Sequence, residues 1–458
     1  IVRNNCTMLE GLQASELTLY SILIFLFLEN LVNLYLTRRQ IFVYETSKDI
    51  PAELRDVMKK ETFEKARLYG LDKANYEVFK LLVCDIAISS IELYTGFVAM
   101  VWMRAMEVTA RVGLDNGSEI QVSIVFLLLI NVIGTFKDMP FKIYSTFVLE
   151  EKHGFNKQTP AFFIKDQIKS FLVGQMLSIP IVAAIVYIVQ IGGNYFFIWL
   201  WAFVGVVSLV LMMVYPVYIA PLFDKFRALE DGELKSSIEQ LAASLKFPLG
   251  KLFVVEGSKR SAHSNAYFTG LFGAKRIVLF DTLLLNKGLP DDSTLTDDEK
   301  GKGCENKEVL AVLAHELGHW KLGHIRKNII IMQVQMFLIF MAFSQLFKYS
   351  PLYQAVGFPP NVQPILIGFL VIVMYVLAPY NTVISFAMTI LSRRFEYQAD
   401  EFANGLGYSK ELGKALVKLH IDNLGFPIYD WMYSAWNHSH PTLLQRLERL
   451  KSLQKKEK

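Results

Sequence analysis

The chain has 458 residues, of which 53% are hydrophobic and 20% are charged, and its mean hydropathy is +0.32. These values agree with a membrane protein. The formal net charge is only +4, and no basic run is interleaved with aromatic residues, so we expect no nucleic-acid partner. Three widely spaced cysteines (Cys6, Cys84 and Cys304) form neither a disulfide framework nor a cysteine metal knuckle, so a metal would need His and carboxylate ligands.

About seven segments are long and apolar enough to cross a lipid bilayer. The third is the shortest, and the last is too long for one straight span, so we expect a kink at Pro379–Asn381. Five polar residues inside the first two spans are costly in lipid unless they face water or polar partners, which indicates an interior polar surface. They are Glu29, Asn30, Asn33, Asp85 and Glu92. The predicted spans are residues 17–36, 79–103, 120–136, 170–190, 194–215, 328–348 and 361–391.

The charges of the loops between these spans predict the orientation of the chain. Residues 37–76 contain nine Lys or Arg and residues 137–169 contain six, whereas residues 104–119 contain two and residues 349–360 contain none. The positive-inside rule therefore places the two Lys/Arg-rich loops in the cytosol. An odd number of spans then puts the N-terminus in the lumen and the C-terminus, together with residues 221–327, on the cytosolic side.

Residues 221–327 are the only stretch between spans that is long enough for a soluble domain. Leu252–Val255 is predicted to be a strand, and residues 263–280, which contain two glycines, are predicted to form a hairpin. Residues 286–306 are polar and acidic, which indicates a mobile surface loop.

A His-Glu-x-x-His motif follows at His315, Glu316 and His319, shortly before the sixth predicted span. On a helix, positions four apart share a face, so both imidazoles can bind one metal while Glu316 lies beside the water that the metal activates. The run Val309–Ala314 favours a helix, which we expect to continue into the sixth span. The alternative is a non-catalytic helix with two otherwise satisfied histidines. The motif favours metal-assisted hydrolysis over that alternative.

A zinc hydrolase needs a third protein ligand. His324 is one residue out of register for the metzincin pattern HExxHxxGxxH, so that class is rejected. Glu396 and Asp400 follow the seventh span directly and so emerge at the depth where the motif helix enters. Glu396 could complete a His-His-Glu set and Asp400 could orient an imidazole, although an ordinary solvated acidic face has the same spacing. His440 and Arg446 could stabilise an oxyanion, or they could mark only a helix start and a solvated side chain.

Five short segments carry a pattern that extends over nearly the whole chain. They are EEKHGFN at 150–156, GSKRSAHSNAYF at 257–268, HELGHW at 315–320, SRRFEYQAD at 392–400 and SHPTLLQRL at 439–447. Together they resemble the type I CAAX prenyl endopeptidases. Members of that family are integral-membrane zinc proteases that process farnesylated proteins, including prelamin A in animals.

For the metal centre, the resemblance implies one Zn²⁺ per chain on His315, His319 and Glu396, with Glu316 as the catalytic base. It also suggests residence in the membranes of the endoplasmic reticulum and the inner nuclear envelope. The lysine pair at 455–456 fits a dilysine signal for retrieval to the endoplasmic reticulum, and its alternative is a solvated basic helix end.

Around the metal, the resemblance implies that a strand at Asn265, Ala266 and Tyr267 lines the substrate groove. It further implies a role for His440 and Arg446 at the site. The spans are expected to enclose a large hydrated chamber.

We therefore predict a mainly α-helical polytopic membrane protein, with about seven transmembrane helices around an interior chamber and a small α+β gluzincin-like protease domain. The predicted function is removal of the C-terminal tripeptide from prenylated CAAX proteins by single-step hydrolysis, with a second cut further upstream. Two other classes remain open, namely a broader metalloprotease that clears misfolded or stalled membrane proteins, and a transporter or channel. The predicted divisions are 1–220 with five spans, 221–327 as the cytosolic protease segment, 328–391 with two spans, and 392–458 as a cytosolic helical region with the third zinc ligand.

Overall fold

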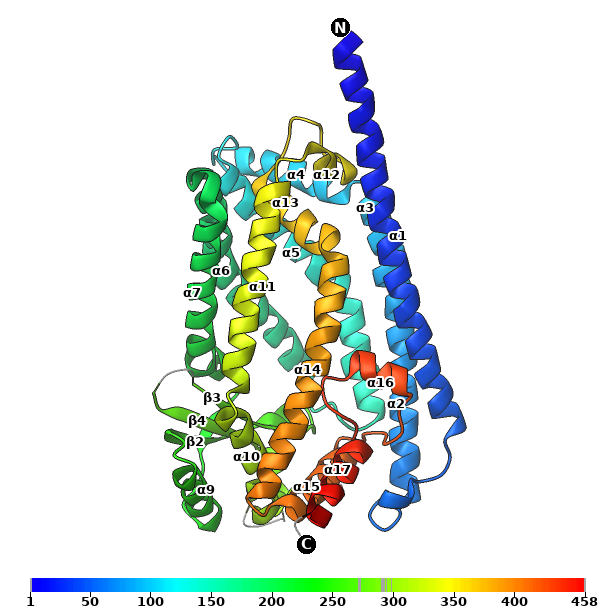
Figure 1. Ribbon diagram of the computed structural model, residues 1–458, viewed down its shortest axis with the longest axis vertical. Coiled ribbons are helices and arrows are strands. Elements are labelled where there is room, and N and C mark those ends of the chain that lie inside the picture. Colours follow the sequence, from blue (N-terminus) through cyan, green and yellow to red (C-terminus); the bar gives the residue numbers. More distant parts are fainter. Residues whose placement is uncertain (1, 271–272, 290–292, 294, 298, 457–458) are drawn as a thin grey trace.

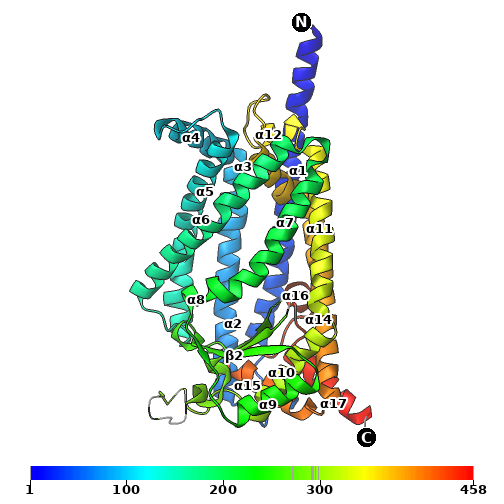
Figure 2. The same ribbon diagram turned by 90° about the vertical axis from the view of Figure 1, so that its left-hand side faces the viewer.

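The computed structural model describes residues 2–270, 273–289, 293, 295–297 and 299–456, and most of these are helical. Long helices run side by side along the molecule (Figure 1). A small sheet and the C-terminus lie at one end, and the N-terminus projects from the other (Figures 1 and 2). Within the described residues, five helices are long and apolar enough to cross a membrane, or seven if each of two bent pairs is one span. The predicted class, a polytopic helical membrane protein with a small sheet, is confirmed.

The five straight candidate spans overlap the predicted segments and begin before them, and all but the last also end beyond them. The third, predicted at 120–136, is 32 residues long because the helix continues past Lys137 and Pro140. Lys137 ends the apolar segment in the sequence, but its ammonium lies 3.0 Å from Glu92, so this charge is paired within the helix bundle. The five are Gln13–Thr46 in α1 (Val2–Thr46), Glu119–Glu150 with α5 (Glu119–Tyr144), Pro160–Ile191 (α6), Gly193–Phe223 with α7 (Phe196–Val214) and α8 (Ala220–Phe223), and His324–Leu346 (α11).

The second predicted span, 79–103, is wrong beyond Tyr94. The chain continues from α2 (Lys60–Lys80) through a π-helical stretch (Leu81–Ile88) into α3 (Ser89–Tyr94), and then bends by 62° into α4 (Phe97–Arg111). The bend is at Gly96, whose φ is +66°, a conformation that favours glycine. A Cβ on Gly357 would lie 2.8 Å from the Gly96 Cα, so two glycine backbones touch here. Hydropathy alone does not reveal such a turn.

The predicted kink in the last span is present, two residues earlier than expected. A bend of 59° separates α13 (Ile365–Val371) and its π-helical extension (Ile372–Val376) from α14 (Ala378–Gly405). Pro379 lies in the first turn of α14, where a missing N–H leaves no hydrogen bond unmade. From there α14 continues without a break through Glu396 and Asp400.

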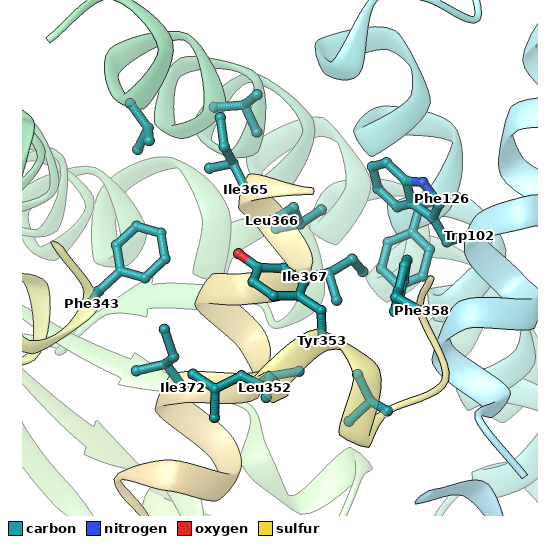
Figure 3. Packing of buried hydrophobic residues seen from close by; sticks show 14 of the residues in the cluster. Trp102, Phe126, Phe343, Leu352, Tyr353, Phe358, Ile365, Leu366, Ile367 and Ile372 are labelled. Carbon is teal, nitrogen blue, oxygen red and sulfur yellow. The ribbon is translucent and has the colours of Figure 1, made fainter. Parts of the chain in front are cut away.

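A hydrophobic core closes the end of the bundle opposite the sheet. There α4, α5 and α11 meet α13 and the short helix α12 (Ser350–Ala355). The rings of Trp102 and Phe126 pack at 5.6 Å with a tilt of 52°, and Phe343 and Ile367 are fully buried around Tyr353 (Figure 3). The Tyr353 hydroxyl donates to a backbone carbonyl at 2.6 Å, so the most buried phenol is also satisfied.

The other end contains the sheet and a second core. The strand order is β1-β2-β4-β3, with β1 antiparallel to β2, β2 parallel to β4, and β3 antiparallel to β4, so β3 is an edge strand. The predicted hairpin and the predicted strand at 252–255 are confirmed. Of the predicted acidic loop, Asp291, Asp292 and Asp298 lie outside the described residues. The strands are β1 (Phe226–Ala228), β2 (Leu249–Val255), β3 (Ala266–Thr269) and β4 (Lys275–Phe280).

Helices α9 (Glu233–Ser244), α10 (Asn306–Lys321) and α15 (Ser409–Asp422) pack beside this sheet and bury its apolar side chains. The short helix α16 (Trp431–Asn437) and α17 (Leu443–Lys456) complete this end. The prediction that α10 continues into the sixth span is wrong. Gly323, with φ at +68°, ends the first helix, and α11 begins anew at His324.

Candidate metal centre and active site

The HExxH motif lies within α10, whose position is fixed at its start. The Glu305 side chain accepts a backbone N–H from the first turn, and the Glu308 carboxylate accepts the Glu305 N–H at 2.8 Å, which forms a capping box. Lys418 of α15 pairs with Glu308 at 2.7 Å. The following apolar run is buried against the sheet and α14, so the motif is held in a rigid helix.

Helix α14 packs against α10 at the motif and brings Glu396 to the two histidines. The helices come close because position 318 is glycine, where a Cβ would press against α14. The two Glu396 oxygens lie 3.3 Å from His315 Nε2 and 3.3 Å from His319 Nε2, and the two Nε2 atoms are 3.2 Å apart. One donor atom from each residue therefore lies within 4.8 Å of the others.

The chemistry of this cluster fits a divalent cation such as zinc. Two imidazole nitrogens and one carboxylate oxygen form a donor set that zinc accepts, leaving a position for water or substrate. Glu396 Oε2 is buried and accepts no hydrogen bond of good geometry from the described residues, although His440 Nδ1 lies 2.9 Å away. Burial acts to lower the pKa of His315, but hydrogen bonds to Asp400 and Glu396 raise it to about 9. The carboxylates around His315 therefore favour positive charge at this position, and a bound cation would supply it.

Asp400 and Arg446 support His315 from behind. Asp400 is fully buried, and its Oδ1 lies 2.9 Å from His315 Nδ1. The Arg446 guanidinium of α17 donates to both Asp400 oxygens, at 2.9 and 2.6 Å. Burial acts to lower the pKa of Arg446, but the Asp400 charge outweighs it and raises that pKa. The buried carboxylate is thus paired, and His315 keeps its Nε2 directed toward Glu396.

His319 is supported differently, by a chain of neutral groups. His324 is almost fully buried, stacks on Phe395 at 4.0 Å, and places its Nδ1 3.0 Å from His319 Nδ1. Its Nε2 lies 3.0 Å from Gln398 Oε1, which can only accept. His324 must therefore donate from Nε2 and accept at Nδ1. This leaves the proton of His319 on Nδ1 and the lone pair of His319 on Nε2, where a metal would bind.

The segment with His440 is attached to α14 by Arg393, one turn before Glu396. The Arg393 guanidinium donates to the Ser434 carbonyl at 3.1 Å, to the His440 carbonyl at 3.4 Å, and to Gln445 Oε1 at 2.9 Å. The His440 side chain itself is 63% exposed, so it can reach a bound peptide. Arg393 therefore positions the loop that carries His440 and leads into α17.

Glu316 lies on α10 between the two histidines and is half-buried. Burial raises the pKa of Glu316, which brings the basicity of this carboxylate closer to neutral pH. The edge strand β3 contacts α10 nearby. Ala266 and Tyr267 lie on this strand, whereas Asn265 precedes it by one residue.

All the residues that the sequence singled out for the metal centre converge on one point. His315, His319 and Glu396 form the cluster, and Asp400, Arg446 and His440 contact it. Sequence reasoning missed the roles of His324, Gln398 and Arg393. For Arg393 a signal existed, since it lies three residues before Glu396 on the same helix face. The register argument excluded His324 as a direct metal ligand and did not consider it as a hydrogen-bond partner of His319.

Comparisons with known proteins cover nearly the whole chain. Residues 40–225 match the family "CAAX prenyl protease N-terminal, five membrane helices", and residues 228–454 match "Peptidase family M48". The chain is 48% identical over 453 residues to the CAAX prenyl protease 1 homolog of Homo sapiens, covering 94% of this chain and 95% of the relative. It is 39% identical over 441 residues to CAAX prenyl protease 1 of Saccharomyces cerevisiae, covering 93% of each. The crystal structure of S. mikatae Ste24p superposes with a TM-score of 0.84 at 38% identity, covering 94% of this chain and 98% of that one. The chain therefore belongs to the type I CAAX prenyl endopeptidases, a family of membrane metalloendopeptidases.

Proposed function

We propose that this membrane protease is zinc-dependent and cleaves prenylated CAAX proteins just after the prenylated cysteine. The cut releases the C-terminal tripeptide, and a second cut follows further upstream in suitable substrates. The observation that carries this proposal is the buried cluster of His315, His319 and Glu396, which lies where α10 and α14 meet the membrane-spanning part.

His315, His319 and Glu396 would hold the ion. When bound, zinc supplies a Lewis acid that activates water and polarises the scissile carbonyl. Glu316 takes the proton from the attacking water and passes it to the leaving amine. The exposed His440 is placed to donate to the carbonyl oxygen as that oxygen gains charge. No covalent acyl-enzyme is needed.

The edge of β3 offers the substrate a backbone template. The Asn265 carbonyl accepts the Phe280 N–H of β4 at 3.0 Å. Because neighbouring residues of an antiparallel strand direct their backbone groups to opposite edges, Ala266 and Phe268 direct theirs to the open edge. An extended peptide can add there, main chain to main chain. Asn265 Oδ1 now accepts the Ala266 N–H at 2.8 Å, so this side chain can exchange that contact for one with the peptide.

Loose packing in the middle of the bundle supports an interior chamber. The middle stretches of four spanning segments, residues 75–92, 127–148, 325–339 and 379–394, contain no buried residue. The accessible surface of the chain is 24649 Å². A compact monomer of 52.3 kDa would expose about 17,500 Å². The excess fits helices exposed on two sides, one toward lipid and one toward an enclosed space, with the projecting end of α1 adding to it.

The position of the site explains why a lipid-modified substrate suits it. The cluster lies on helices that adjoin spans, so a soluble polypeptide would have to reach membrane depth unaided. A prenyl chain partitions into that region with about 0.8 kcal/mol per buried CH₂. The lipid would thus concentrate the attached C-terminus near Glu396.

We place the catalytic end in the cytosol or nucleoplasm and the protein in the endoplasmic reticulum and inner nuclear membranes. The position of the first Lys/Arg-rich loop, residues 37–76, supports this orientation. Leu54 and Met58 of this loop pack with Phe426 and Leu443 of the C-terminal region. That loop and the metal centre therefore lie at the same end (Figure 1). By the positive-inside rule, this end faces the cytosol.

The test measures zinc content and peptide cleavage with the purified full-length protein. We expect one zinc per chain and a much higher kcat/KM for a farnesylated peptide than for its unmodified twin. Glu316→Gln should keep the zinc and abolish cleavage of both peptides. Equal kcat/KM for the two peptides would favour the broader quality-control protease. Loss of zinc in Glu316→Gln would make Glu316 a ligand and overturn the assigned roles.

A further inference from the structure

A cavity of about 280 Å³ lies between α2 and the C-terminal region. Two of its lining residues adjoin the proposed catalytic parts. His263 precedes Asn265 by two residues, and His438 precedes His440 by two residues. The cavity therefore borders both the approach to the substrate strand and the loop that contacts Glu396. Its volume is close to the lower end for ligand pockets, about 300 Å³, which suits the end of a peptide.

The walls of this cavity are held by specific contacts. The His263 ring stacks on Phe155 at 4.2 Å, and its Nδ1 lies 3.3 Å from Asn423 Oδ1. The Tyr69 hydroxyl donates to Glu150 at 2.8 Å. These contacts join α2, the segment after α5, the approach to β3 and the end of α15, so the cavity is a defined feature of the fold.

Lys73 is the lysine that lines this cavity, and its ammonium lies 4.9 Å from the centre of the Tyr69 ring. Across the described part of the chain, no carboxylate lies within 4.0 Å of the Lys73 ammonium. The described residues also give no hydrogen-bond partner to the hydroxyls of Tyr429 and Tyr433, which line the same cavity. Glu77, one turn further along α2, is the acidic residue of the lining. The cavity thus offers phenol donors and a cation that has no carboxylate within 4.0 Å, although its charge also acts on Glu77 and Glu150.

The direction of the bound peptide connects this cavity with the reaction. A peptide that continues the antiparallel pattern on the open edge of β3 has its C-terminal side toward Asn265 and His263. If the cut releases three residues, the terminal carboxylate lies about 10 Å beyond the scissile bond in an extended chain. His263, which lines the cavity, lies two residues beyond Asn265 in that direction.

We propose that this cavity binds the C-terminal carboxylate of the substrate and that Lys73 is the residue that selects it. This inference rests on the proposed tripeptide-releasing activity. The ammonium and the tyrosine hydroxyls bind the carboxylate, and Glu77 disfavours an acidic side chain on the last residue. The upstream cut presents no chain end at this distance, so it does not depend on Lys73.

The experiment compares two farnesylated peptides of identical sequence, one ending in a free carboxylate and one in a carboxamide. For the wild-type enzyme we expect kcat/KM to be about tenfold higher for the free acid, as a charge-assisted contact implies. Lys73→Met should bring the ratio of the two kcat/KM values close to one, and Lys73→Arg should restore the preference. Lys60→Met, at the start of the same helix and outside the cavity lining, should keep the wild-type ratio. Glu77→Gln should increase the preference for the acid.

Each outcome has a defined meaning. A wild-type ratio near one overturns the inference and leaves the proposed activity standing. The inference is also overturned if Lys73→Met lowers kcat/KM equally for both peptides and the ratio of the two values stays near ten. Lys73 is then a structural residue. If the wild-type enzyme cleaves neither peptide, the proposed function fails and this inference fails with it. Zinc content of every variant, which Lys73 should not affect, identifies misfolded protein.

Discussion

Replacing His324 by Phe should weaken zinc binding without removing a ligand. His324 accepts the Nδ1–H of His319 at 3.0 Å and stacks on Phe395 at 4.0 Å. Phenylalanine can keep the stacked contact with Phe395 and fill most of the same space. The change therefore isolates the hydrogen bond, which is the reason to choose Phe rather than Ala.

The size of the effect follows from the tautomers of His319. Without metal, His319 in the variant can carry its proton on Nε2 and avoid leaving a buried donor unpaired. Binding a metal at Nε2 forces the proton back to Nδ1, where the variant offers no acceptor. A buried unpaired donor costs about 1–3 kcal/mol. This corresponds to zinc binding that is weaker by about 10- to 100-fold, the usual range for partners of ligand imidazoles.

The assay is competition for zinc between the protein and a chelator of known affinity, with thermal unfolding of the metal-free protein as a second readout. His324→Asn is the matched control, because the Asn oxygen lies close to the position of the missing Nδ1 and can accept the same proton. We expect Asn to recover much of the affinity that Phe loses. Wild-type zinc affinity in His324→Phe would refute the argument, as would equal losses in both variants.

Three further changes test other parts of the site. Asp400→Ala should lower zinc affinity or activity by about 10- to 100-fold, and unchanged values would remove Asp400 from the support of His315. Asn265→Ala should lower kcat/KM for all substrates at unchanged zinc content, and a bound peptide that lies away from β3 would contradict the groove. Arg393→Gln should lower kcat several-fold with zinc retained, because the loop with His440 loses its hydrogen bonds to α14; loss of zinc would instead give Arg393 a role in the metal site.

Hydropathy predicted where the spans lie but not how they end. The apolar segments stop at the first charged residues, whereas the helices continue because those charges find partners, as Lys137 does with Glu92. Backbone turns were harder to predict. Gly96 reads as one small residue in an apolar run, and its left-handed conformation depends on contact with Gly357, which is distant in sequence.

The metal cluster could be predicted because its parts carry local patterns. The HExxH spacing places two imidazoles on one helix face, and the pair Glu396 and Asp400 has the same spacing. The partners of these residues lie on other elements. Arg446 reaches Asp400 across 46 positions, and no local pattern in the sequence states that α17 packs there.

The break at Gly323 shows how the membrane connection and the metal site depend on each other. On a continuous helix, His324 would lie five residues beyond His319, rotated by about 140° and directed away from it. The left-handed turn at Gly323 reverses this, so His324 begins α11 with its ring 3.0 Å from His319. The first residue of the sixth span is therefore also the residue that orients a ligand. A displacement of α11 within the bilayer would therefore change the hydrogen bond to His319. The sixth span thus contacts the metal centre through the His324 side chain, while α14 carries Glu396 directly.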